Sequence, residues 1–157
     1  MATSMSFQPI EDRVRAEAGA ELQATLIELI DLALLGKQLH WSVVGPQFRA
    51  IHLELDEFVE SWRELADTIA ERQAAIGFWP DGQASTVTAA GLTGVERGPL
   101  DGEQVLATLV THLEQVVAPA RDRMQHLGVL DLPSQDILIE VISTLEEHLW
   151  MLRAQLG

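Results

Sequence analysis

The sequence has 157 residues, of which 47% are apolar, 22% are charged and 5% are aromatic, as in one globular domain with a full hydrophobic core. Its 24 acidic and 10 basic side chains give a formal net charge of −14, which opposes binding to nucleic-acid phosphates over a broad surface. Cysteine is absent, which excludes disulfides, thiolate metal sites, iron-sulfur clusters and thiol nucleophiles. Any metal site must therefore be built from His, Asp or Glu.

The start of the chain has neither the basic residues nor the apolar run of a signal peptide, and nowhere do eighteen apolar residues follow one another. We therefore expect a cytoplasmic protein that does not enter a membrane. The composition predicts a single domain over residues 1–157, with residues 1–10 as a short N-terminal tail.

Two helices are predicted in the first half of the chain, because apolar residues recur there at helical spacing. The first covers residues 11–43 and stops at Gly45-Pro46, where the proline disfavours helix in the residue before it. The second covers residues 47–75 and is closed by Gly77. No stretch of the chain alternates with the period of a β-strand.

The second half begins with a long connection, residues 79–102, whose Gly and Pro residues leave room for one short helical turn. A third helix is predicted from residue 103 to Gly128, with a kink at Pro119, and a fourth over residues 134–154. Two helix pairs joined by a long crossover predict an all-α fold, a four-helix bundle of the ferritin-like kind.

Four metal-ligand side chains share one face of the second helix. At 100° per residue, His52, Asp56, Asp67 and Glu71 form a stripe that points away from the apolar stripe of the same helix. His52 and Asp56 are four residues apart, as are Asp67 and Glu71, so each pair is able to share one ion. These four ligands are therefore predicted to face away from the bundle core.

A single chain cannot close this site. Asp56 and Asp67 are eleven residues apart, about 16 Å along a helix, which is too far for one ion with ligand bonds of about 2 Å. An antiparallel copy of the helix, crossing at a two-fold axis level with Ser61 and Trp62, places the His-Asp half of one chain against the Asp-Glu half of the other. The spacing predicts a dimer with two metal sites at its interface.

His40 is a fifth candidate ligand. It precedes Gly45 by five residues and His52 follows it by seven, so a helical hairpin sets both imidazoles at a similar height. None of the five histidines belongs to a Glu-x-x-His motif, which supplies the ligands of di-iron sites inside a single bundle. The sequence therefore disfavours that competing arrangement.

Three segments together resemble the Dps family, the DNA-binding proteins from starved cells, or mini-ferritins. They are residues 37–48 (KQLHWSVVGPQF), the motif His52-x3-Asp56-Glu57-Phe58, and residues 67–72 (DTIAER); His148-Leu149-Trp150 in the last helix is also similar. The resemblance implies a hollow dodecamer of four-helix bundles with ferroxidase sites at two-fold interfaces. Two positions depart from the family pattern, Ser42 and Gln47, each of which is usually Asn.

The resemblance also implies a ligand set and an activity. His40, His52 and Asp56 of one subunit, with Asp67 and Glu71 of the partner subunit, are expected to bind Fe(II) as both metal-binding and catalytic residues. The protein is then a ferroxidase that oxidises Fe(II) with hydrogen peroxide, or more slowly with dioxygen, stores Fe(III) in its cage and limits oxidative damage. Asp122, Asp131 and Asp136 are candidates for an iron-entry pore at a three-fold axis.

Two other classes of function remain open. One is a structural stress protein of the same fold that binds and compacts DNA. The charge disfavours it, because the chain has a single lysine, Lys37, and residues 1–10 hold no Lys or Arg for a DNA-binding tail. The other is a four-helix binding module whose carboxylates have no metal role, since an acidic helix face is most often simply solvated.

Overall fold

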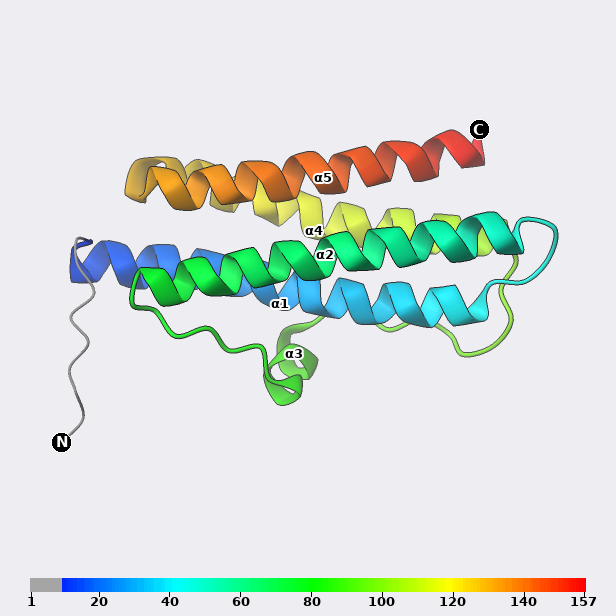
Figure 1. The fold of residues 1–157 in the computed structure, drawn as a ribbon, viewed down its shortest axis with the longest axis horizontal. Coiled ribbons are helices and arrows are strands. Elements are labelled where there is room, and N and C mark those ends of the chain that lie inside the picture. Colours follow the sequence, from blue (N-terminus) through cyan, green and yellow to red (C-terminus); the bar gives the residue numbers. More distant parts are fainter. Residues whose placement is uncertain (1–9) are drawn as a thin grey trace.

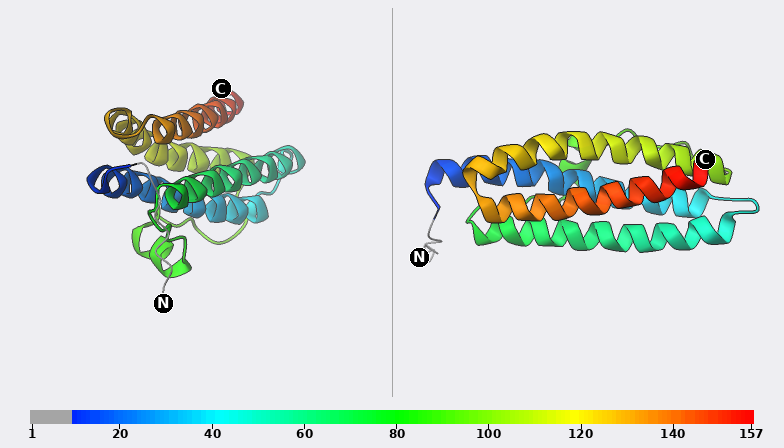
Figure 2. Two further views of the ribbon diagram at one scale, coloured as in Figure 1. Left: turned by 60° about the vertical axis from the view of Figure 1, so that its left-hand side comes forward. Right: turned by 90° about the horizontal axis from the view of Figure 1, so that it is seen from above.

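The computed structural model describes residues 10–157, so the predicted tail lies, apart from Ile10, outside the described residues. Four long helices form an elongated bundle, in which α1 (Asp12–Ser42) pairs with α2 (Phe48–Ala75), and α4 (Gly102–Leu130) pairs with α5 (Leu132–Leu156) (Figure 1). The short α3 (Ala84–Ala90) lies in the crossover, against α1 and outside the bundle (Figure 2). The predicted ferritin-like topology, including the short helix in the crossover, is confirmed.

The helix ends follow local sequence chemistry. α4 starts with a capping box in which the Asp101 carboxylate accepts the Gln104 backbone N–H at 2.9 Å, while the Gln104 side chain accepts the Asp101 N–H at 3.0 Å. The first hairpin turns at Gly45, whose φ of +98° favours glycine. The crossover returns to this turn, where Val43 and Leu100 form an isolated parallel bridge.

The end predicted for the third helix at Gly128 is wrong. α4 continues through Pro119 and Gly128 as far as Leu130, and Asp131 both ends α4 and caps α5. The end of the Gln135 side chain from the next helix lies against Gly128, so a Cβ at this position would have to displace it. Consequently α5 begins at Leu132, earlier than the predicted residue 134, and it ends at Leu156 rather than at residue 154.

The core is a continuous apolar cluster between the four long helices, to which α2 contributes the predicted stripe, with Trp62 fully buried. The apolar surface removed from water by this cluster is the main favourable contribution to folding. No helix among residues 10–157 is long and apolar enough to cross a membrane.

A buried histidine of α5 sits in this core against α2. The Trp62 Nε1–H donates to His148 Nδ1 at 3.1 Å, and Phe58 stacks on the imidazole with ring centroids 3.9 Å apart. Burial lowers the pKa of His148 from 6.5 to about 4. His148 is therefore neutral at pH 7, and its role is to fill and hydrogen-bond the core.

The pKa of His148 predicts a pH-dependent stability. Between pH 6.5 and pH 4 the unfolded chain binds a proton at this imidazole and the folded chain does not, so acidification through this window lowers the free energy of unfolding by roughly 3 kcal/mol. Urea unfolding of the parent and of His148→Phe at pH 7 and pH 4.5 measures the difference. We expect a smaller acid-induced loss in the variant, and an equal loss in both proteins contradicts the prediction.

Candidate metal centre

The α1–α2 hairpin brings two predicted ligands into contact. His40 lies in the last turn of α1 and His52 in the first turns of α2, and the short turn between Ser42 and Phe48 keeps the two helices adjacent. The imidazole rings stack with centroids 3.6 Å apart and planes 19° from parallel. The predicted pairing of the two histidines across the hairpin is thus present in the structure.

Each imidazole is oriented by the backbone of the opposite helix. His40 Nδ1 lies 2.8 Å from the carbonyl oxygen of His52, and His52 Nδ1 lies 2.9 Å from the carbonyl oxygen of His40. Because a carbonyl oxygen only accepts, these contacts select the tautomer in which Nδ1 carries the proton. In that tautomer each Nε2 keeps a lone pair that is able to coordinate a metal ion, while His40 Nδ1 also lies 3.4 Å from Asp56 Oδ1.

Asp56 completes a group of three ligands. One ligand atom from each of His40, His52 and Asp56 falls within 4.8 Å of the others. The exposed Asp56 carboxylate also accepts a hydrogen bond from Lys37 Nζ at 2.6 Å. That hydrogen bond, helped by the charge of Lys37 and by those of His40 and His52 when they are protonated, holds the pKa of the Asp56 carboxyl below its ordinary value despite an opposing effect of desolvation. The carboxylate is thus kept in the ionised form that binds a cation.

Lys37 is the feature of this group that the sequence left without a role. It lies one helical turn before His40 on α1, so its spacing places it on the side of the histidine ligand. Its ammonium occupies only Asp56 Oδ1, so the second carboxylate oxygen stays available to a metal ion. The Lys37 charge lowers the net negative charge that Asp56 offers to a metal ion.

The structure does not bring Asp67 and Glu71 to this group. Both are exposed on α2, and the metal-ligand group among the described residues comprises only His40, His52 and Asp56. Eleven straight helical residues between Asp56 and Asp67 correspond to about 16 Å. Three of the five predicted ligands therefore come together in one group, and the other two lie farther along α2.

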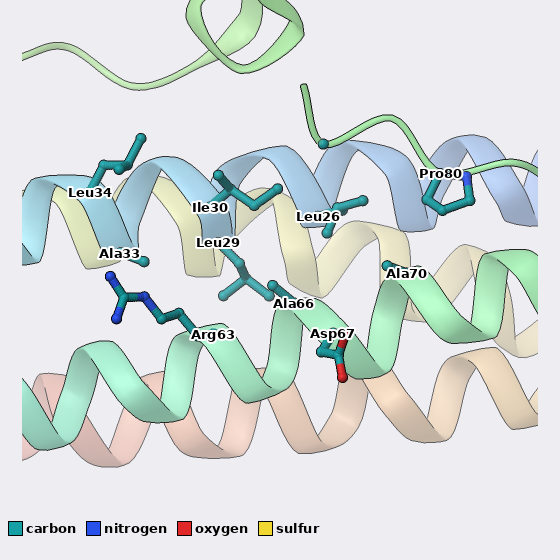
Figure 3. A pocket seen from close by; sticks show the side chains of 11 residues that line it. Leu26, Leu29, Ile30, Ala33, Leu34, Arg63, Ala66, Asp67, Ala70 and Pro80 are labelled. Atoms are coloured by element: carbon teal, nitrogen blue, oxygen red, sulfur yellow. The ribbon is translucent and has the colours of Figure 1, made fainter. Parts of the chain in front are cut away.

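A largely apolar pocket of about 380 Å³ lies beside the second pair. Figure 3 shows α1 side chains on one side of it and Arg63, Ala66, Asp67 and Ala70 of α2 on the other. Its rim includes Leu34, which is 59% exposed. Its α1 lining consists of Leu26, Leu29, Ile30, Ala33 and Leu34.

Comparison with known proteins gives consistent relatives. The family model for the ferritin-like domain matches residues 19–157. A "DNA protection during starvation protein" of Mycolicibacterium smegmatis is 34% identical over 98% of this chain and 85% of its own length.

Solved structures agree with the sequence comparison. A Dps of Mycobacterium smegmatis superposes with a TM-score of 0.93 at 32% identity, covering 98% of this chain and 95% of that one. A Dps of Microbacterium arborescens, solved in a high iron form, has a TM-score of 0.89 at 32% identity and covers 93% and 96% of the two chains. With the bundle, its crossover helix and sequence identity over nearly the whole chain in agreement, this chain belongs to the Dps family of ferritin-like proteins.

Proposed function

We propose that this protein oxidises and stores iron, binding Fe(II) as its substrate at ferroxidase sites shared between two subunits. The observation that carries the proposal is the oriented group of His40, His52 and Asp56, whose ligand atoms converge within 4.8 Å. Neutral imidazole nitrogen and carboxylate oxygen are suitable ligands for Fe(II). The relative from Microbacterium arborescens, solved in a high iron form, supports iron as the metal.

The other half of each site comes from Asp67 and Glu71 of the partner subunit. A two-fold axis close to Ser61 and Trp62 runs two α2 helices antiparallel and sets each carboxylate pair against the other chain's histidines. The apolar pocket beside Asp67 supports this arrangement, because a partner seated there covers exposed leucine at the same time as it completes the ligand set.

The chain's own groups prepare the site for oxidation. The two Nε2 lone pairs and the Asp56 carboxylate bind Fe(II) while leaving positions open for water and oxidant. Each Fe(II) ion gives up one electron, and hydrogen peroxide takes up two electrons and two protons to become water. Pairing the iron ions at one site favours this complete reduction over the release of a hydroxyl radical. Dioxygen is the slower alternative oxidant.

Storage follows from the assembly we propose, a hollow dodecamer in the cytoplasm that holds the Fe(III) product. The net charge of −14 per chain favours the accumulation of cations at such a shell. Entry through a pore lined by Asp122 and Asp136 stays a prediction. For Asp131, the third candidate, a place at the pore also stays a prediction, and its carboxylate forms an ion pair with Arg72 at 2.6 Å.

The test is Fe(II) oxidation by the assembled full chain. Fe(II) followed by hydrogen peroxide is expected to give a rise in near-ultraviolet absorbance at least roughly tenfold faster than in buffer. A protein that oxidises iron no faster than buffer contradicts the proposal and favours the binding-module alternative. The double variant His52→Ala, Asp67→Ala is expected to be inactive, and activity equal to the parent's shows that the site is elsewhere.

The DNA-compacting alternative is separated by a second readout. The Mycolicibacterium smegmatis relative is named for DNA protection, but this chain has 24 acidic side chains against 10 basic ones, of which a single one is lysine. We expect little retardation of plasmid DNA in a gel shift at moderate salt. Strong retardation together with slow iron oxidation favours the structural role.

A further inference from the structure

The last turn of α2 is tied to the corner between α4 and α5 by one arginine. Arg72 Nη2 donates to Asp131 Oδ2 at 2.6 Å, and Arg72 Nε donates to Ser134 Oγ at 3.0 Å. Asp131 is itself a corner residue: its N–H donates to the Leu127 carbonyl at 2.8 Å, and its side chain caps the N-terminus of α5. The guanidinium therefore binds two residues of the α4–α5 corner, Asp131 and Ser134, at the same time.

This contact is shielded from water. Ser134 is fully buried, and the side chains of Arg72 and Asp131 are 21% and 10% exposed. Burial raises the pKa of Asp131, but the hydrogen bonds from Ser134 and Arg72 outweigh it and hold the pKa below its ordinary value. The ion pair thus persists at neutral pH with little freedom for other geometries.

The opposite side of the same turn is fixed to α1. The Gln73 side chain is fully buried, and its Nε2 donates to the Gly19 carbonyl at 3.3 Å and to Gln23 Oε1 at 3.0 Å. Glu71 precedes these two residues and is exposed, and no hydrogen bond or ion pair of its carboxylate is found within residues 10–157. The backbone beneath Glu71 is therefore held by its neighbours, whereas the carboxylate is free to meet a ligand.

We propose that Arg72 is a positioning residue for Glu71, which fixes the last turn of α2 so that this carboxylate meets the metal held by the partner subunit. Helix ends fray when their last carbonyls lack partners, and Glu71 lies only one turn from Ala75, the end of α2. A ligand has to be held to within about 0.5 Å of its productive position. The inference rests on the proposed function and deepens it.

Zn(II) binding to the assembled full chain tests the proposal, because calorimetry with Zn(II) reports the ligand set without any oxidation. Arg72→Gln is expected to weaken binding roughly tenfold, as loss of a supporting partner does at other metal sites. Arg72→Lys keeps one charged hydrogen bond to Asp131 and is expected to recover most of that loss. Oligomeric state by size exclusion is expected to match the parent in both variants.

Two comparisons separate positioning from general stability. In a Glu71→Gln background, Arg72→Gln is expected to add no further loss, because the two changes act on the same ligand. The matched control is Arg123→Gln, which breaks another arginine-carboxylate contact between helices, Arg123 to Glu28 at 2.5 and 2.9 Å. The side chains of that pair are 16% and 15% exposed, and the control is expected to lower the unfolding temperature while leaving Zn(II) affinity unchanged.

The outcomes distinguish a failure of the Arg72 positioning role from a failure of the proposed iron-oxidising function. If the parent binds and oxidises iron while Arg72→Gln binds Zn(II) as the parent does, the positioning role is wrong and the proposed function stands. The positioning role is also wrong if Arg72→Gln weakens binding equally with and without Glu71, or if Arg123→Gln weakens it to the same degree. A parent that binds neither Zn(II) nor Fe(II) overturns the proposed function, and this inference with it.

Discussion

Mixing two inactive variants, His52→Ala and Asp67→Ala, is expected to restore about a quarter of the parent's iron-oxidising sites. Each variant alone loses one half of every site. In a mixed dimer, one site receives both damaged halves, and the other receives both intact halves. Random pairing makes half of the dimers mixed, and each of those has one working site of two. The subunits are unfolded together, refolded, and assayed for Fe(II) oxidation with hydrogen peroxide.

The chain offers a matched control for this experiment. His52→Ala and Asp56→Ala damage the same half-site, since both side chains belong to the group that lies within 4.8 Å. Every site in a mixture of these two variants receives one damaged histidine half, so the mixture is expected to stay inactive. Sites built within single chains predict no recovery in either mixture. An inactive His52→Ala and Asp67→Ala mixture, in refolded material of parental size, therefore contradicts the shared site.

The largest expected loss of stability comes from Trp62→Ala, about 3–5 kcal/mol in the free energy of unfolding. Trp62 is fully buried and packs against Gly36 of α1, where a Cβ would lie 2.7 Å from the indole ring. Removing the indole empties this space and leaves the buried His148 Nδ1 without its donor. Denaturant unfolding at matched protein concentration measures the change, since assembly also contributes to stability.

Trp62→Phe serves as the comparison for that variant. It keeps an aromatic ring against Gly36 but removes the Nε1–H donated to His148, so we expect a loss of about 1–3 kcal/mol, smaller than that of the alanine variant. A loss below about 1 kcal/mol for Trp62→Ala contradicts the assigned packing role, because truncation of a core tryptophan with no relaxation costs several times more.

The parts of this fold that follow from local rules could be predicted from the sequence. Helical periodicity marked the four long helices, and Gly45-Pro46 marked the hairpin that sets His40 beside His52. The helix end predicted at Gly128 was wrong. Glycine is common just after a helix, so the sequence alone favours an end there, whereas in the structure Gly128 lies inside α4 and contacts another helix. That contact is with Gln135 in the next helix, which periodicity along one helix does not reveal.

In the candidate site too, the features set by spacing within one helix could be predicted, and the contacts between helices could not. Spacing on one helix separated His52 and Asp56 from Asp67 and Glu71, and the structure places only the former pair with His40. The Lys37–Asp56 and Arg72–Asp131 contacts join residues that are nineteen and fifty-nine positions apart in the sequence. They depend on how the helices pack and where the side chains point, which the spacing along one helix does not give. Asp131 therefore read as one more pore candidate, although its carboxylate caps a helix and binds arginine.

The crossed bonds between the two imidazoles and the two backbone carbonyls make the histidines mutually dependent. When either ring is replaced, the surviving ring keeps its carbonyl acceptor but loses the stacked face that limits its rotation. The hydrogen bond to the carbonyl oxygen alone then directs its lone pair. Losing one imidazole thus removes one ligand from the metal and also loosens the second, so the two side chains act as one binding unit.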